Sequence, residues 1–164
     1  MLAGRGTWPA VPSVMPGEAF GSWFGRVASR YGIGVRDLAR AAEIELDFGE
    51  DGAGWLDASP PQGRDATRLS SRSGIQLEVF ERTPRTGSQL RTYEFCHHCL
   101  VVNPVDITAP YWQQRWLASS DWTCLEHPRE RSWVTRIQLG TCRNMSNLLA
   151  FIWHQCPCRR AWMG

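Results

Sequence analysis

Two short pairs of cysteine and histidine residues constrain this chain more than any other feature. Two residues separate Cys96 from Cys99, and two residues separate Cys124 from His127. This spacing lets both side chains of a tight turn converge on one ion, and a structural zinc ion takes four such ligands at tetrahedral corners. The sequence therefore predicts a structural zinc site. The 24 residues between the pairs leave room for the paired strands of a zinc ribbon.

His97 and His98 lie inside the first pair. A turn that is committed to metal through both cysteines points its middle side chains outward, so we expect solvent or partner contacts rather than metal ligation for these imidazoles. A nuclease that used either histidine would need an acidic or second histidine partner, and none is placed near by spacing.

A second set of potential zinc ligands comes later in the chain. Cys142, Cys156 and Cys158 supply three thiols, and His154 lies close to the last two in sequence. The position three residues after Cys142, where a second pair would place a cysteine, holds Met145, and a thioether is a poor zinc ligand. Two interpretations stay open: His154 completes a second zinc shell, or apolar packing replaces the metal.

The N-terminal half is predicted to be helical. Apolar residues recur at helical spacing from Glu18 to Tyr31, and Gly32 and Gly34 then interrupt the pattern. The same period continues through Val35, Leu38 and Ala42, so residues 18–44 are predicted to form a helix, a tight glycine turn and a second short helix. This order has the shape of a helix-turn-helix, although helical hairpins that never touch DNA are common. Residues 47–63 are rich in Gly, Asp and Pro and are predicted to form a linker.

A second pair of short helices is expected after this linker, with Asp65 as an N-cap and Ser73 and Gly74 at the turn. Arginines spaced four apart line one side of its first helix, which suits either phosphate contact or an ordinary solvated face. The end of the chain is also basic. The candidate nucleic-acid or partner contacts are therefore Arg64, Arg68, Arg72, Arg159 and Arg160.

These patterns predict a mainly α fold with a small β component, in which helix-turn-helix-type helices precede zinc-ribbon modules. The expected domains are a lead over residues 1–15, a helical domain over 16–90, and a zinc-binding domain over 91–164 that carries the first zinc ribbon and the second set of ligands.

Composition excludes several classes of protein. All 18 basic residues are arginine, so the lysine of a standard phosphate-binding loop is absent. The pattern also excludes a zinc-dependent nucleobase deaminase. Those enzymes need His-x-Glu before their cysteines and an open coordination position, whereas here the histidine follows the cysteines and four protein ligands close the site. No run approaches the roughly 20 apolar residues of a membrane span. We expect a cytoplasmic protein, in whose reducing surroundings paired cysteines indicate metal rather than disulfides.

Three further segments carry a resemblance to a known family. The segment 16–32 (PGEAFGSWFGRVASRYG) resembles the opening of TniQ proteins, which serve transposition. The segments 110–116 (PYWQQRW) and 122–127 (WTCLEH), with the first cysteine pair before them, are similar in order and spacing to the zinc-binding core of that family. Zinc chemistry does not demand the tryptophans in these segments, so the combination is more specific than either part.

The resemblance implies a small, non-catalytic adaptor of bacterial transposons that CRISPR effectors guide. Such an adaptor links an RNA-guided effector or its guide RNA to an AAA+ ATPase on DNA, and a homodimer stays open. The first four ligands match one zinc site of the family, and Cys142, Cys156 and Cys158 match three ligands of a second, from which Met145 departs. The alternative is a stand-alone helix-turn-helix and zinc-ribbon regulator that binds DNA by itself.

Overall fold

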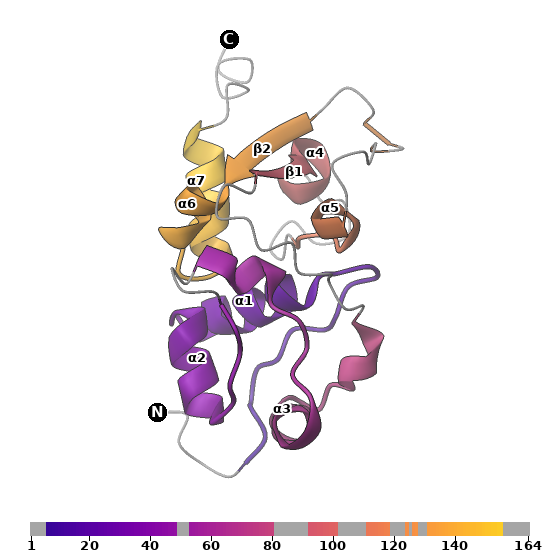
Figure 1. Ribbon diagram of the computed structural model, residues 1–164, viewed down its shortest axis with the longest axis vertical. Helices are drawn as coiled ribbons and strands as arrows, with labels where there is room; N and C mark the ends of the chain where they lie inside the picture. Colours follow the sequence, from indigo (N-terminus) through magenta and orange to yellow (C-terminus); the bar gives the residue numbers. More distant parts are fainter. Residues whose placement is uncertain are drawn as a thin grey trace.

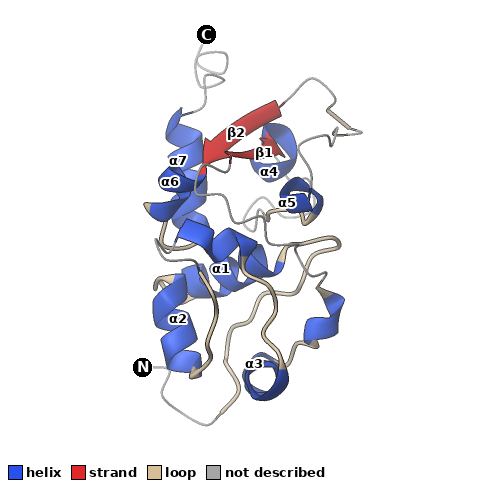
Figure 2. Ribbon diagram, in the orientation of Figure 1, coloured by secondary structure: helices blue, strands red, loops and turns tan. Residues whose placement is uncertain are grey.

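The computed structural model describes residues 6–48, 53–80, 92–101, 111–118, 124, 126–127 and 131–155. Over these residues the chain is mainly helical, with one small sheet (Figures 1 and 2). The α-helices are α1 (Phe20–Arg30), α2 (Val35–Ala42), α3 (Gly63–Ser73), α4 (His97–Val101), α5 (Arg115–Ala118), α6 (Arg136–Gly140) and α7 (Met145–Gln155). Two 3-10 turns, η1 (Ala53–Asp57) and η2 (Leu77–Val79), and the strands β1 (Thr92–Cys96) and β2 (Arg131–Thr135) complete the order.

The N-terminal helices confirm the predicted hairpin. α1 turns its apolar stripe into the core, where Trp23 and Val27 are fully buried. Gly32 adopts a positive φ of 66° in the turn, a conformation that costs glycine little because it has no Cβ. α2 then begins after Gly34 and ends at a left-handed Glu43. The period of the apolar residues and the two glycines were sufficient to place both helices.

The region after α2 differs from the prediction in two ways. α3 begins after Gln62, so Asp65 lies in its first turn, where its carboxylate accepts a hydrogen bond from the Glu45 backbone at 3.0 Å. The helix does end at Gly74, whose φ is 71°. α3 thus confirms the first helix of the expected second pair, whereas residues 75–80 form only the 3-10 turn η2, so the expected second helix is wrong over these residues. The apolar residues of this segment span only six positions, which is too short a pattern to identify a helix.

The sheet contains β1 and β2, paired antiparallel with Thr92 opposite Thr135 and Cys96 opposite Arg131. These strands flank the two ligand pairs: β1 ends at Cys96, and β2 begins after His127. The described residues between the pairs contain α5 instead. None of the described residues between the pairs forms a strand, so the zinc ribbon expected there stays a prediction, and the observed strands β1 and β2 lie outside the pairs.

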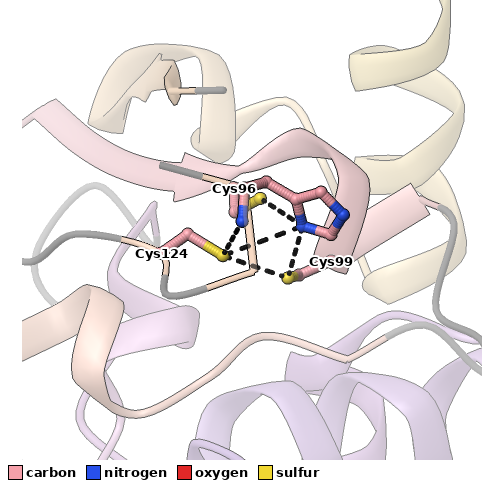
Figure 3. A group of neighbouring side chains, drawn as sticks. Cys96, Cys99 and Cys124 are labelled. Carbon is pink, nitrogen blue, oxygen red and sulfur yellow. Dashed lines mark hydrogen bonds between the residues drawn. The ribbon is translucent and has the colours of Figure 1, made fainter. Parts of the chain in front are cut away.

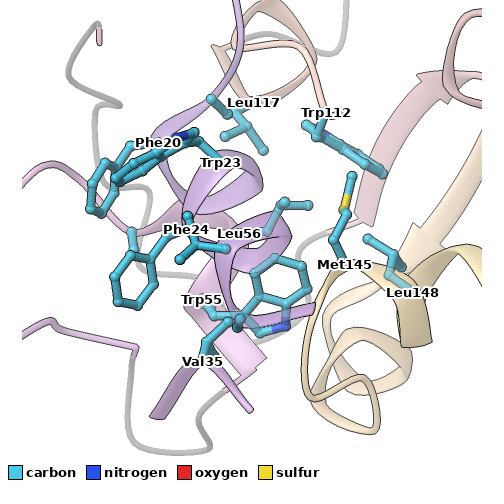
Figure 4. Close-up of a cluster of buried hydrophobic side chains, with 14 of the residues drawn as sticks. Phe20, Trp23, Phe24, Val35, Trp55, Leu56, Trp112, Leu117, Met145 and Leu148 are labelled. Carbon is cyan, nitrogen blue, oxygen red and sulfur yellow. The ribbon is translucent and has the colours of Figure 1, made fainter. Parts of the chain in front are cut away.

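The core is built around Trp55, in the segment that was predicted to be a linker. Trp55 is buried on η1, and its indole Nε1 donates a hydrogen bond to the Cys142 carbonyl oxygen at 3.0 Å. Figure 4 shows its ring among side chains from α1, α2 and α7. A Cβ on Gly25 would lie 2.6 Å from this ring, so glycine allows α1 to approach it. The segment 53–58 therefore belongs to the core.

A second, polar connection joins α1 to the segment before α5. The buried carboxylate of Glu18 lies 2.7 Å from the Arg26 guanidinium and accepts a hydrogen bond from the Ser22 hydroxyl at 2.9 Å. That hydroxyl in turn accepts one from the Trp112 backbone at 2.7 Å. Burial raises the pKa of Glu18. The charge of Arg26 and the hydrogen bonds to the carboxylate act to lower it, but they do not outweigh burial, so the pKa stays above its usual value.

The hydrophobic core runs across residue 90, where the sequence predicted a domain boundary. α1 packs on η1 and on α7, so elements from both predicted domains share apolar contacts. The division into domains at this point stays a prediction. Among the described helices, none combines the length and the apolar character that crossing a bilayer requires.

Candidate metal centre

The sheet and the short helix that follows it position the first ligand pair. Cys96 is the last residue of β1, where pairing with Arg131 fixes its backbone. Cys99 follows in the first turn of α4. The chain thus changes from strand to helix between the two cysteines, and the helical turn brings the second thiol to the same side as the first.

The second pair is held by its own backbone. The His127 N–H points at the Cys124 sulfur, with 3.3 Å between nitrogen and Sγ. This contact closes a tight turn, and the imidazole Nδ1 lies near all three thiols. Figure 3 shows the sulfurs of Cys96, Cys99 and Cys124 turned towards one another.

The four predicted ligands lie together. One donor atom from each of Cys96, Cys99, Cys124 and His127 lies within 4.8 Å of all the others, so the group could hold one metal ion. His127 Nδ1 is 3.7, 3.5 and 3.8 Å from the Cys96, Cys99 and Cys124 sulfurs, and the last two sulfurs are 3.5 Å apart. The thiols are free, since a disulfide would bring two sulfurs to about 2.05 Å.

The thiols differ in acidity because their surroundings differ. Burial raises the pKa of Cys96 and of Cys99, and contact with Cys124 raises both further. Burial also acts to raise the pKa of Cys124, but hydrogen bonds from the His127 backbone, the His127 ring and Cys99 outweigh it and hold that pKa at about 7. Cys124 is therefore the thiol that ionises first, and a cation at the centre would favour ionisation of all three.

The two histidines inside the first pair do not point away from the protein as expected. His97 is only 7% exposed. His98 is partly buried and stacks on His127, with ring centroids 4.8 Å apart and an angle of 19° between the planes. The expectation of outward histidines is wrong because α4, rather than an isolated turn, carries them, and a helix distributes successive side chains around its axis.

The second predicted site is described only in part. Cys142 is buried, with its sulfur 3.6 Å from the Gln138 carbonyl oxygen, and His154 is exposed on α7. Cys156 and Cys158 lie outside the described residues. Met145 is buried in the core, near Leu56 and Trp112 in Figure 4. The second site therefore stays a prediction.

Two of the three α3 arginines contact the end of α2. Arg68 Nη1 donates to the Glu43 carbonyl oxygen and Arg72 Nη1 to the Ala41 carbonyl oxygen, both at 2.7 Å. These guanidiniums satisfy carbonyls that the last turn of α2 leaves without helical partners. Arg64 is exposed. Arg159 and Arg160 lie outside the described residues.

The structure also brings together arginines that the sequence did not single out. Arg36, Arg40 and Arg143 surround one pocket beside α2. Asp37 and Arg143, which contact each other there, are 106 residues apart, so no local pattern could have connected them.

Comparisons with models of protein families, with curated proteins and with solved structures find no match.

Proposed function

We propose that the four clustered residues bind Zn²⁺ as a structural ion. A tetrahedral zinc with bonds of about 2.3 Å to sulfur and about 2.1 Å to nitrogen separates two sulfurs by about 3.8 Å and a sulfur from a nitrogen by about 3.6 Å. The distances of 3.5–3.8 Å between His127 Nδ1 and the three sulfurs, and of 3.5 Å between the Cys99 and Cys124 sulfurs, match four of the six edges of that tetrahedron, and all six lie within 4.8 Å. Three thiolates and one imidazole also suit zinc better than magnesium or calcium.

Four protein ligands leave no coordination position for water or substrate, so this zinc would act as scaffold rather than as catalyst. It would join β1 and α4 to the segment around His127. Binding to such sites can supply roughly 10–16 kcal/mol, coupled to folding.

On this scaffold we propose a non-catalytic adaptor of the TniQ kind, which links an RNA-guided recognition complex to an AAA+ transposition regulator on DNA in the bacterial cytoplasm. One structural observation supports this proposal: residues 16–32 and residues 110–116, two of the segments that resemble TniQ proteins, pair with each other through their backbones. The Ala19 backbone donates to the Trp112 carbonyl oxygen at 2.9 Å, and the Gln114 backbone donates to that of Gly17 at 2.8 Å. A pattern shared by chance would not require these segments to meet.

A pull-down tests the adaptor. The zinc-loaded chain is immobilised and incubated with the AAA+ ATPase of the same gene neighbourhood, ATP and duplex DNA, with and without the RNA-guided complex. Retention of either partner is expected. Cys99→Ser serves as the unfolded control, since it removes one zinc ligand. The proposal is abandoned if the folded, zinc-loaded chain retains neither partner with DNA present.

The second candidate is a stand-alone DNA-binding regulator. Arg36 and Arg40 project from α2, the second helix of the N-terminal hairpin, and both are exposed. In helix-turn-helix proteins the second helix enters the major groove. A regulator must distinguish sequences, so selection from a random duplex library would enrich one motif with the chain alone. An adaptor would enrich none.

A further inference from the structure

A pocket of about 290 Å³ lies beside the N-terminal end of α2, and residues of α2, of η1 and of the turn between α6 and α7 line it. Trp55 and Val35 contribute to its lining, and Arg36, Arg40 and Arg143 supply three guanidiniums. None of these residues belongs to the metal centre.

Backbone and buried side chains fix the walls of this pocket. The Val35 N–H donates to the Arg143 carbonyl oxygen at 2.8 Å, and the Asn144 amide donates to the Ile33 carbonyl oxygen at 2.8 Å. The Trp55 indole holds the carbonyl of the residue before Arg143. The two parts of the chain that carry the arginines are therefore locked to each other before any ligand arrives.

One carboxylate organises two of the guanidiniums. Asp37 accepts a hydrogen bond from Arg40 on Oδ1 and one from Arg143 on Oδ2, each at 3.2 Å. A Cβ on Gly34 would lie 3.2 Å from Asp37 Oδ2 and 3.5 Å from Arg143 Nε, so glycine keeps room for this contact. Asp37 holds the two cations near each other despite their mutual repulsion.

The pocket keeps a positive surplus. Three arginines face one aspartate, and the Arg40 and Arg143 side chains remain 81% and 72% exposed. Exposed ion pairs of this kind contribute little to stability, so the arrangement is not explained as a stabilising network. A guanidinium presents a planar fork of donors that matches a phosphate, and arginine is enriched where phosphate is recognised.

We propose that this pocket binds a phosphate group of a nucleic-acid backbone. The cavity is slightly smaller than the roughly 300–1,000 Å³ of sites that enclose whole small ligands, and it suits one phosphate on a larger molecule. Exposed guanidiniums hold a lone anion weakly in water, whereas a polymer adds the entropy of released counterions. Contacts to phosphate carry no sequence information, so the site positions the chain on nucleic acid without selecting a sequence.

Fluorescence anisotropy on the zinc-loaded full chain tests this site, using a labelled duplex DNA and a labelled single-stranded RNA between about 50 and 200 mM salt. The double variant Arg36→Ala, Arg143→Ala is expected to weaken DNA binding by about tenfold. The slope of log affinity against log salt concentration should also become less steep, by roughly 0.9 for each lost phosphate contact. The single variants Arg36→Ala and Arg143→Ala are each compared with Arg115→Ala, which removes one positive charge from an exposed position on α5 outside the pocket and should alter binding less than about twofold.

Three results would overturn the proposal. The first is unchanged affinity and salt dependence in a folded double variant. The second is a loss of affinity in Arg115→Ala equal to that in either single pocket variant, and the third is saturable binding of inorganic phosphate without any effect of the variants on DNA or RNA binding. Circular dichroism and zinc content establish that each variant is folded. The measurement needs no ATPase or guide complex, so its failure and the failure of the adaptor proposal are distinguishable.

Discussion

Gly21 lies inside α1, where its backbone approaches η1 more closely than a side chain permits. A Cβ atom at this position would lie 2.5 Å from the carbonyl oxygen of Leu56 and closer still to that of Trp55. Non-bonded heavy atoms prefer separations of about 3.5 Å, so one of the two segments must move by roughly 1 Å. Both contacts are to backbone, and no change of rotamer can relieve them.

Two opposing terms set the size of the effect of Gly21→Ala. Alanine favours a helix interior over glycine by about 1 kcal/mol. Overpacking of a core costs about 1–3 kcal/mol, and the upper end applies here because the indole hydrogen bond to Cys142 restrains Trp55 from moving. We therefore expect the free energy of unfolding to fall by about 2 kcal/mol, and Tm by roughly 4–8 °C for a chain of this size.

Urea denaturation of the zinc-loaded protein, followed by tryptophan fluorescence, measures this change. Gly6→Ala is the matched control, because nothing lies within 4 Å of a Cβ at that position, and its effect should stay within about 0.5 kcal/mol. If Gly21→Ala were as stable as the parent protein or more stable, helix propensity would dominate. The close approach of the Trp55 and Leu56 carbonyl oxygens to Gly21 would then be wrong.

Three other perturbations have defined outcomes. Cys99→Ser should lose zinc, measured by mass spectrometry of the metal, and unfold the C-terminal half in circular dichroism; a native, zinc-loaded variant would contradict the structural site. Zinc affinity, measured by competition with a chelator, should weaken as pH falls, by roughly a hundredfold per unit above pH 7 and by up to roughly a thousandfold per unit well below it. The Cys96 and Cys99 thiols must release protons over the whole range, and Cys124 must do so as well below its pKa of about 7. A flat profile would exclude thiolate ligands. Arg72→Ala should lower the free energy of unfolding, measured by urea denaturation, by about 1.5–2 kcal/mol, because it loses the charge-assisted hydrogen bond to the Ala41 carbonyl of α2. Equal stability of Arg72→Ala and Arg64→Ala would refute that role.

Local patterns were the part of the fold that sequence could predict. The spacing within each ligand pair depends on a single turn, so the four donors could be named from sequence and do lie together. The helices α1 and α2 follow from a 3.6-residue period interrupted by Gly32 and Gly34, which also act locally.

Features that depend on distant residues could not be predicted. Trp55 stands among residues typical of a loop, and only its contact with the residues around Cys142 makes η1 part of the core. The burial of His97 likewise depends on α4, a helix of five residues that is too short to have a recognisable period.

Met145 occupies a position that fits both a zinc-ligand spacing and a buried packing site. Its spacing from Cys142 suggested an incomplete ligand pair, whereas its burial at the start of α7 gives it a packing role against the core. A methionine at a ligand position is thus explained by its neighbours in space.

The hydrogen bond from Trp55 to the Cys142 carbonyl spans 87 residues, and it has a consequence for synthesis. A ribosome adds about 5–20 residues per second, so roughly 5–20 s pass between translation of η1 and translation of α7. Throughout that interval the face of α1 that α7 later covers stays open to water or to chaperones. The nascent chain, rather than the finished protein, is therefore the form most exposed to aggregation, and expression at lower temperature with chaperones present should increase the soluble yield.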